Sequence, residues 1–279
     1  MTRFPFRFGV TLFNASSRSV WRDRVREVES LGFDVLQVGD HLGMPAPFPA
    51  LMAAADVTSM RLGTYVLNAG VVSPTYLARE VAAVHRLTDG RLELGLGTGY
   101  VPAEFEAAGL PYGSGGERVR KLEATLAATR ELLAAEADRP VPPIMLGGAG
   151  DRVLRLGARA ADIFSFSIMA GVTAGMAPED AFARRVQVLR EAAGDRFDDI
   201  ELNLAAAVGE SVDKLDLGFI RQASGLDDAQ LAQLPGVLVG SPREIADRLQ
   251  RYREAYGVSY ISVLEPHLAA FAEVIKHLR

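Results

Sequence analysis

The sequence predicts a (β/α)8 barrel, also called a TIM barrel, with an insertion after the seventh strand. Short apolar runs rich in β-branched residues alternate with helical periodicity from end to end, eight such runs are present, and no break in composition divides the chain. The chain has 279 residues, and barrels of this kind commonly occupy about 250 residues as one unit. We therefore expect a single domain over residues 1–279.

The predicted strands are apolar segments separated by helical or loop-like sequence. In chain order they are Phe6–Phe13, Val35–Val38, Leu62–Leu67, Leu92–Leu96, Ile144–Leu146, Ile163–Phe166, Ile200–Val208 and Tyr260–Leu264. Between them, apolar side chains recur at steps of three and four residues, which is typical of helices that turn one face toward a sheet. Three such stripes are Trp21, Val25, Val28 and Leu31; Val119, Leu122 and Leu126; and Ile245, Leu249, Tyr252 and Tyr256.

The segment from Gly209 to Gly236 is too long for a simple connection after the seventh strand. It combines four aspartates, at positions 213, 216, 227 and 228, with weak apolar spacing. We interpret it as an insertion that serves as a lid or as a subunit contact.

Composition narrows the class of protein. With 49% hydrophobic and 23% charged residues the chain can bury a large core, and its net charge of -5 without a basic block argues against a nucleic-acid partner. The absence of cysteine excludes thiolate catalysis and disulfides, and four histidines without ligand spacing predict no metal site. There is no signal-peptide pattern and no apolar run of about eighteen residues. These features favour a cytoplasmic enzyme that acts on a small molecule, without a membrane partner.

In a barrel of this kind the active site lies at the carboxyl ends of the strands. Few polar groups and glycine turns follow the predicted strands directly. They are Asn14, Asp40, His41, Asn68, Thr98, Tyr100, Gly147–Gly150, Ser165, Ser167, Glu265 and His267. Asp40-His41 is the best pair among them, because an adjacent acid and imidazole can bind a ring edge or move a proton near neutral pH. The alternative for this pair is a loop cap with a partly buried histidine.

The strand-to-turn junction from Arg91 to Tyr100 ends in three spaced glycines, Gly95, Gly97 and Gly99. Glycine inside a strand weakens packing and raises the entropic cost of folding, so the spacing needs a further reason. We interpret it as a surface that lets the backbone approach a flat cofactor ring. The alternative is a tight turn from strand to helix.

Gly147-Gly-Ala-Gly150 leads directly into a predicted helix that begins near Asp151. Free backbone amides at such a helix start can hold a phosphate. A cap by the Asp151 carboxylate would satisfy the same amides, which is the structural alternative. Further on, the apolar loop Phe166–Pro178 carries no charge before Glu179, so it would either line a pocket for an apolar substrate or simply pack its methionines beneath itself.

Taken together, several ordered segments resemble the luciferase-like monooxygenase superfamily, whose members are barrels that bind FMN or the deazaflavin coenzyme F-420. The segments are Leu77-Ala-Arg79, Leu87-Thr-Asp-Gly-Arg91, Leu94-Gly-Leu-Gly-Thr-Gly99, Glu104-Phe-Glu-Ala-Ala-Gly-Leu-Pro-Tyr112, Glu117-Arg118, Leu122-Glu123 and Gly240-Ser-Pro-Arg-Glu244. No single motif carries the resemblance; their order and spacing do. The chain is most similar to the deazaflavin-dependent branch.

That resemblance implies roles for particular residues. Asp40 would hold cofactor hydroxyls or the ring edge, and His41 would lie near the site of hydride transfer. Thr64-Tyr-Val-Leu-Asn68 resembles the strand that carries a cis non-proline peptide behind the ring, which would fall at Tyr65-Val66.

The same resemblance implies further cofactor contacts. Asn68, Thr98, Gly99 and Tyr100 would lie at the cofactor, and Gly147 and Gly148 would take its phosphate. The family also tends to form homodimers, so we expect a homodimer here.

One position departs from the sugar-phosphate dehydrogenases of this branch, which carry a glutamate directly after the Gly-Thr-Gly turn. Tyr100 stands there, and a phenol with an ordinary pKa near 10 cannot replace that carboxylate as a base. This argues against a sugar-phosphate substrate and favours an aromatic pocket wall. Glu104, Glu117 and Arg118 are interpreted as helix-cap and ion-pair residues.

The leading hypothesis is therefore an oxidoreductase that transfers a hydride between coenzyme F-420 and a small, largely apolar organic substrate, with His41 handling the proton. One alternative is an FMN-dependent monooxygenase of the same family. A second alternative is a catalytically silent flavin-binding protein.

Overall fold

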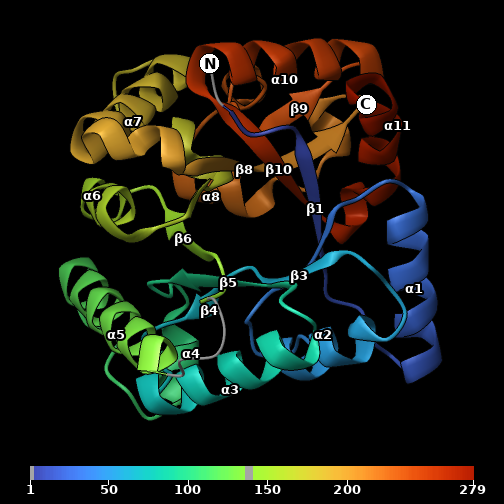
Figure 1. Cartoon of the computed structure of the whole chain (residues 1–279). Helices are drawn as coiled ribbons and strands as arrows, with labels where there is room; N and C mark the ends of the chain where they lie inside the picture. The colour runs from blue at the N-terminus through green and yellow to red at the C-terminus, as the bar shows by residue number, and fades with distance from the viewer. Residues whose placement is uncertain (1–2, 136–140) are drawn as a thin grey trace. The chain divides into compact units, whose positions relative to one another are not determined.

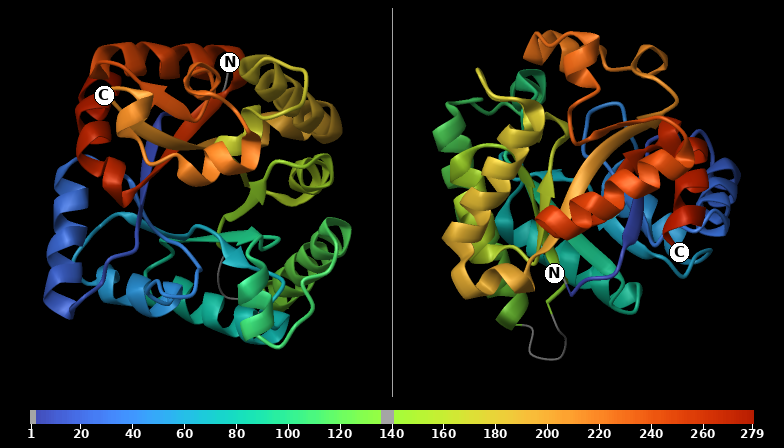
Figure 2. Two further views of the ribbon diagram at one scale, coloured as in Figure 1. Left: turned by 180° about the vertical axis from the view of Figure 1, so that it is seen from behind. Right: turned by 90° about the horizontal axis from the view of Figure 1, so that it is seen from above.

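The computed structural model describes residues 3–135 and 141–279 (Figures 1 and 2). Its contacts divide the chain into two compact units. The N-terminal unit consists of Thr11–Ser30 and Val35–Gly147. The C-terminal unit consists of Gly148–Arg279 together with Met1–Val10 and Leu31–Asp34.

The N-terminal unit is built on parallel strands in the order β2-β3-β5-β6. The strands are β2 (Val35–Val38), β3 (Arg61–Thr64), β4 (Leu67–Asn68), β5 (Leu92–Gly97) and β6 (Ile144–Gly148). The first strand, β1 (Arg7–Leu12), belongs to the C-terminal unit up to Val10 and to the N-terminal unit from Thr11. The helices are α1 (Arg18–Ser30), α2 (Pro47–Ala55), α3 (Pro74–Leu87), α4 (Pro102–Ala107) and α5 (Gly115–Ala135). Within this unit α3 and α5 lie side by side (Figure 1).

The C-terminal unit has parallel strands in the order β7-β8-β10. They are β7 (Ile163–Phe166), β8 (Glu201–Gly209) and β10 (Val258–Leu264), and the short β9 (Val237–Val239) pairs with the end of β8. The helices are α6 (Asp151–Ala160), α7 (Pro178–Ala193), α8 (Gly218–Ser224), α9 (Asp228–Leu231), α10 (Pro242–Tyr256) and α11 (Leu268–Leu278). Four short 3-10 turns complete the described part of the chain: η1 (Ile168–Gly171), η2 (Gly194–Asp199), η3 (Val212–Lys214) and η4 (Glu265–His267).

These elements confirm the predicted fold class, a (β/α)8 barrel. Ten strands are described; β4 continues the line of β3 along β5, and β9 extends β8, which leaves eight barrel strands. Each of the eight is followed by at least one helix. Every predicted strand overlaps an observed one, but the third prediction is wrong in detail, because Leu62–Leu67 is divided into β3 and β4 by the residues Tyr65 and Val66.

The predicted apolar stripes form the buried faces of their helices. Trp21, Val25 and Val28 are buried in α1, and the Trp21 indole donates to the Ala50 carbonyl at 3.0 Å. Leu31 lies just beyond the end of α1 and is only half-buried. In the other two predicted stripes Leu122 and Leu126 are buried in α5, and Ile245, Leu249 and Tyr252 are buried in α10. Val119 and Tyr256, which the same stripes include, are only half-buried.

The start of α10 follows the sequence pattern that the resemblance singled out. Ser241 and Glu244 form a reciprocal capping box, in which each side chain satisfies the backbone amide of the other. Pro242 occupies the first turn, where no amide donor is needed.

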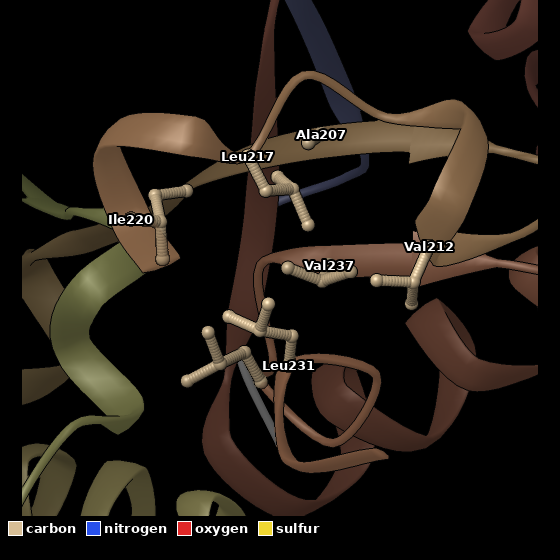
Figure 3. Close-up of a cluster of buried hydrophobic side chains, with 7 residues drawn as sticks. Ala207, Val212, Leu217, Ile220, Leu231 and Val237 are labelled. Carbon is tan, nitrogen blue, oxygen red and sulfur yellow. The ribbon is translucent and has the colours of Figure 1, made fainter. Parts of the chain in front are cut away.

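The predicted insertion, residues 209–236, has a small apolar core of its own. Seven buried side chains make up this insertion cluster (Figure 3): Ala207, Val212, Leu217, Ile220, Leu231, Leu234 and Val237. Because the cluster includes residues of β8 and β9, the insertion is anchored to the strand from which it emerges.

Candidate active site

His41 lies three residues beyond the end of β2, and both of its ring nitrogens have partners. Its Nδ1 is 2.7 Å from Oε1 of Glu104, in the first turn of α4. The same carboxylate oxygen accepts a hydrogen bond from the Leu42 amide at 3.3 Å. A carboxylate accepts and does not donate, so the Nδ1 atom carries the proton in this contact. Glu104 therefore fixes the position of the imidazole and determines which nitrogen is the acceptor.

Tyr100 occupies the other side of the imidazole. Its hydroxyl is 3.2 Å from Nε2 of His41, and the two rings meet edge to face with centroids 5.4 Å apart. Burial of part of the ring, followed by the charge of Glu104, raises the pKa of Tyr100 above its ordinary value of 10. The hydroxyl is thus protonated at neutral pH and donates to Nε2.

Neighbouring aromatic and cationic groups hold the backbone at Tyr100. The Tyr112 hydroxyl donates to the Tyr100 carbonyl at 3.2 Å. Arg118 donates to the Gly99 carbonyl at 3.1 Å and lies over the Tyr112 ring at 3.9 Å. Arg118 is therefore a structural support of the turn from Gly99 to Tyr100, in agreement with the structural role predicted for it.

Glu104 is a residue of the site that the sequence did not identify as such. The predicted role in an ion pair is confirmed, but its partner is the imidazole of His41, which was not predicted. Its position four residues after Tyr100, in the first turn of a helix that follows a strand end, is the only sequence signal that points to the site. Glu117, by contrast, accepts a hydrogen bond from the Ser114 amide at 2.7 Å and serves the start of α5, as predicted.

Asp40 and Asn68 form a second polar pair at the ends of β2 and β4. Asp40 Oδ2 accepts from the Asn68 amide at 2.9 Å, and Asn68 Oδ1 accepts from the Gly70 amide at 2.9 Å. The Asn68 residue is only 5% exposed, and its Nδ2 is a buried donor without a protein partner. Because an unpaired buried amide is costly, this atom has the character of a ligand contact.

The three spaced glycines have a different physical reason from the one predicted. A methyl group at Gly95 would lie 2.0 Å from the Thr64 carbonyl oxygen, and one at Gly97 would lie 2.6 Å from a Val66 methyl. A methyl group at Gly99, where φ is +68°, would meet the Asn68 side chain at 2.4 Å. The glycines therefore allow close packing of β5 against the segment 64–68, and the prediction that they open the strand to a flat ring is wrong for Gly95 and Gly97.

The segment that packs on these glycines contains the cis peptide bond Tyr65-Val66 at the position the resemblance implies. Thr64 is tied to β5 by two hydrogen bonds, since its hydroxyl donates to the Gly95 carbonyl at 2.9 Å and accepts from the Gly95 amide at 2.8 Å. Tyr65, Val66, Thr98 and Gly99 are all half-buried. They lie within the same unit as Asp40 and His41.

The glycine turn after β6 leads into α6, whose N-cap residue is Gly150. The Asp151 side chain is therefore not the cap, and that structural alternative is wrong; Asp151 is the first residue of the helix. Gly148 has a packing reason to be glycine, because a methyl group there would lie 2.8 Å from Val153 Cγ1. Gly150 faces open space at an ordinary φ of -83°, so nothing in the fold requires glycine there.

Arg185 of α7 was not singled out in the sequence, yet it organises the C-terminal side of this turn. Its guanidinium donates to the carbonyls of Ala149, Ala170 and Val172. Burial lowers the pKa of Arg185, with the nearby charge of Asp151 opposing the effect. This residue links the turn before α6 to the apolar loop that follows β7.

The apolar loop after β7 packs mainly against the insertion. Ile168, Met169 and Val172 lie against the insertion cluster. A methyl group at Gly171 would approach Pro235 Cδ to 2.8 Å. These contacts favour the packing alternative for Met169, while Met176 is 38% exposed.

Two further strand-end candidates, Ser165 and His267, have structural surroundings in the C-terminal unit. The buried Ser165 hydroxyl donates to Asn203 Oδ1 at 2.7 Å, and Asn203 donates to Ser262 at 2.8 Å. His267 Nδ1 lies 3.1 Å from the Val208 carbonyl, and burial lowers the pKa of this histidine. Within residues 3–135 and 141–279, no group of three or more acidic or histidine side chains could hold a metal ion. The helices in this same part of the chain include none long and apolar enough to cross a membrane.

Comparison with known proteins agrees with this fold. The family model described as luciferase-like monooxygenase matches residues 4–216. The structure of the coenzyme F420-dependent tetrahydromethanopterin reductase from Methanopyrus kandleri superposes with a TM-score of 0.75 at 16% identity, covering 99% of this chain and 100% of that one.

Two other proteins show the range of the similarity. The oxygenating constituent of 3,6-diketocamphane monooxygenase from Pseudomonas putida, a type II Baeyer-Villiger monooxygenase solved with FMN, gives a TM-score of 0.72 at 14% identity, covering 99% of this chain and 98% of that one. The uncharacterized protein y4vJ of Sinorhizobium fredii is 33% identical over 107 residues, which are 35% of this chain and 30% of that protein. The match thus spans less than a third of the curated relative.

The barrel fold and the family match define an oxidoreductase of the luciferase-like type. The chain belongs to the luciferase-like monooxygenase family. Of the two solved structures, one is described as coenzyme F420-dependent and the other as a complex with FMN.

Proposed function

We propose that the protein is a coenzyme F-420-dependent oxidoreductase that transfers a hydride between the deazaflavin and a small, largely apolar organic substrate. The observation that carries the proposal is the position of His41, held through Nδ1 by Glu104 in the same unit as a buried, unpaired Asn68 amide. A fixed imidazole supplies proton transfer, and an orphaned donor supplies a ligand contact. The deazaflavin, when bound, accepts or supplies the hydride.

The residues around Asn68 fit such a cofactor. Asn68 Nδ2 would donate to an acceptor on the ring or on its side chain, which would satisfy the atom that the fold leaves unpaired. Asp40, which also orders the Asn68 backbone, would accept from a cofactor donor with its other carboxylate oxygen. Tyr65 and Val66 would line the back of the ring site.

Further cofactor contacts are proposed from the strand ends. Thr98, Gly99 and Tyr100 would face the ring from the end of β5, and Gly147 and Gly148 at the end of β6 would take the phosphate. The open space at Gly150 supports an anion at the start of α6, where the amides of Asp151 and Arg152 precede the first internal hydrogen bonds of the helix. The amides of Val153 and Leu154 already donate to the Gly150 carbonyl.

The surroundings of His41 support an apolar substrate. Leu42, Met44 and Tyr100 are exposed by 71%, 37% and 59%. Large apolar side chains exposed next to a polar centre are typical of a ligand site. We also propose that the protein acts as a cytoplasmic homodimer in which residues 1–279 form one domain.

The test is hydride transfer by purified protein. Reduced coenzyme F-420 is mixed with candidate aldehydes, ketones and activated alkenes, and the oxidised cofactor is followed by absorbance under anaerobic conditions. His41→Gln should lower turnover by about 10²- to 10⁴-fold, the usual contribution of a positioned acid or base, while cofactor affinity is kept. His277→Gln, in the exposed part of α11, is the matched control.

Two results would contradict the proposal. Full turnover by His41→Gln would remove the assigned proton-handling role. Binding of reduced FMN alone, with oxygen consumption and product oxygenation, would instead assign the protein to the FMN-dependent monooxygenases of the family.

A further inference from the structure

His41 has no free ring nitrogen with which to meet a substrate. Nδ1 faces Glu104 at 2.7 Å and Nε2 faces the Tyr100 hydroxyl at 3.2 Å. A proton exchanged between His41 and a substrate must therefore pass through Tyr100 or displace it. The sequence alone predicts that Tyr100 is a cofactor contact and an aromatic pocket wall, but it does not predict a role in proton transfer.

We propose that Tyr100, His41 and Glu104 form a proton relay in which the Tyr100 hydroxyl is the group that meets the substrate. His41 is the second member, and Glu104 is a positioning residue that holds the imidazole from behind. The inference deepens the proposed function and rests on it for the identity of the reaction, but the relay itself is defined by residues of this chain.

The order of the three residues follows from their exposure. Tyr100 is 59% exposed as a residue, whereas the side chains of His41 and Glu104 are exposed by 31% and 12%. The relay thus runs from a solvent-accessible phenol to an enclosed carboxylate. A role as a pocket wall alone does not require the contact between the Tyr100 hydroxyl and the acceptor nitrogen Nε2 of His41.

Proton movement along the relay balances in both directions. When a substrate hydroxyl is oxidised, its proton passes to the Tyr100 oxygen while the Tyr100 proton passes to Nε2 of His41. The imidazolium that results carries a proton on each nitrogen and lies against the Glu104 carboxylate. When a carbonyl is reduced, the relay starts from the imidazolium form of His41: the Tyr100 proton passes to the substrate oxygen, and Nε2 passes its proton to the Tyr100 oxygen. The neutral imidazole that results takes up a proton from solvent before the next turnover, and in the oxidative direction the imidazolium releases its extra proton to solvent. The relay moves one proton and no electrons.

Glu104 makes this order chemically possible. Because its carboxylate accepts from Nδ1 and from the Leu42 amide, the neutral imidazole is held with its proton on Nδ1 and its lone pair on Nε2. Burial and the charge of Glu104 raise the pKa of Tyr100, so the phenol is protonated at neutral pH and enters the relay as an O–H donor in either direction.

The relay is tested first without any cofactor. The chain has four histidines, and nitrogen-15 NMR of the imidazoles, with His41→Gln as the assignment standard, identifies the protonated nitrogen of His41. The relay predicts the Nδ1-protonated form with a hydrogen-bonded Nε2. Glu104→Ala should shift the population toward the tautomer with its proton on Nε2, whereas Glu106→Ala, which changes an exposed glutamate of the same helix, should leave the signals unchanged.

The same spectra test the contact with Tyr100. Tyr100→Phe should move the Nε2 resonance toward the position of a nitrogen without a hydrogen-bond donor, and Tyr76→Phe, an exposed tyrosine on α3, should not. A His41 with its proton on Nε2, or an Nε2 signal unaffected by Tyr100→Phe, would overturn the relay. Because no cofactor is present, these outcomes do not depend on the choice between F-420 and FMN.

Turnover then tests the function of the relay. Tyr100→Phe should lower kcat by about 10²-fold or more with little change in KM, and the rate should lose its solvent deuterium isotope effect. Full kcat in Tyr100→Phe with an altered KM would show a pocket wall and overturn the relay. Failure to turn over any F-420 substrate in wild-type protein, with the NMR results as predicted, would instead contradict the proposed function.

Discussion

Replacement of Gly95 by alanine is the sharpest test of why the glycine-rich junction exists. The new methyl group would lie 2.0 Å from the Thr64 carbonyl oxygen and 2.9 Å from a Val66 methyl. The first contact is with backbone in a buried strand, so no side-chain rotation can relieve it. Either β5 or β3 must move.

The expected loss in the free energy of unfolding is the sum of two contributions. Overpacking of this kind costs about 1–3 kcal/mol. Separation of the strands also strains the two hydrogen bonds between Thr64 and Gly95, at 2.8 and 2.9 Å, each contributing about 0.5–1.5 kcal/mol. The expected loss is therefore about 2–6 kcal/mol. At roughly 2 °C per kcal/mol for a chain of this length, Tm should fall by about 4–12 °C.

The assay is differential scanning calorimetry of wild type and variants at matched concentration. Gly115→Ala is the control, because that glycine begins α5 with an ordinary φ and its nearest neighbour, the end of the Arg118 side chain, is 3.9 Å away. Its Tm should stay unchanged or rise slightly. A Gly95→Ala protein with wild-type Tm would refute the packing argument and restore the interpretation that the glycines exist only for a ligand.

Three further outcomes follow from the charges and hydrogen bonds of the structure. Glu104→Gln removes a charge that raises the pKa of Tyr100, so the phenol should ionise at lower pH in an absorbance titration that uses Tyr100→Phe as the blank; an unchanged titration would place the carboxylate elsewhere. Arg185→Met leaves several carbonyls without their donor, so the free energy of unfolding measured by chemical denaturation should fall by about 2–4 kcal/mol. Arg184→Met, a change in an exposed residue, should lower it by less than about 0.5 kcal/mol. Equal effects of the two changes would contradict the role of Arg185. Burial holds the pKa of His267 below its ordinary value of 6.5, so the unfolded chain binds more protons and the free energy of unfolding falls as the pH drops below 6.5. In His267→Gln the free energy of unfolding should therefore fall less steeply over the same pH range. A pH profile identical to that of the wild type would contradict a neutral imidazole at this position.

The fold could be predicted from the sequence because its signals are local and repeated. Apolar runs mark strands, and stripes such as Trp21, Val25 and Val28 mark the buried faces of helices. The division of the third strand at Tyr65 and Val66 could not be derived from periodicity, since both residues favour extended backbone. Only the resemblance to a family placed the cis bond there.

The site was predicted in part. Asp40, His41 and Asn68 lie at or just beyond the ends of their strands, so the rule for barrel active sites identified them. The partner of His41 could not be identified in this way, because 63 residues separate Glu104 from it and the contact depends on the orientation of α4. Arg185 was missed for the same reason: its carbonyl partners belong to two turns that only the folded chain brings together.

The most direct test of the central claim is an equilibrium titration of the cofactor-free protein with coenzyme F-420 and with FMN, followed by fluorescence. The account predicts tighter binding of the deazaflavin, and a loss of about 5- to 150-fold in Asn68→Ala, because the buried amide then no longer contributes the roughly 1–3 kcal/mol of a satisfied donor. Preference for FMN would contradict the assigned cofactor. Wild-type affinity in Asn68→Ala would contradict the assigned site.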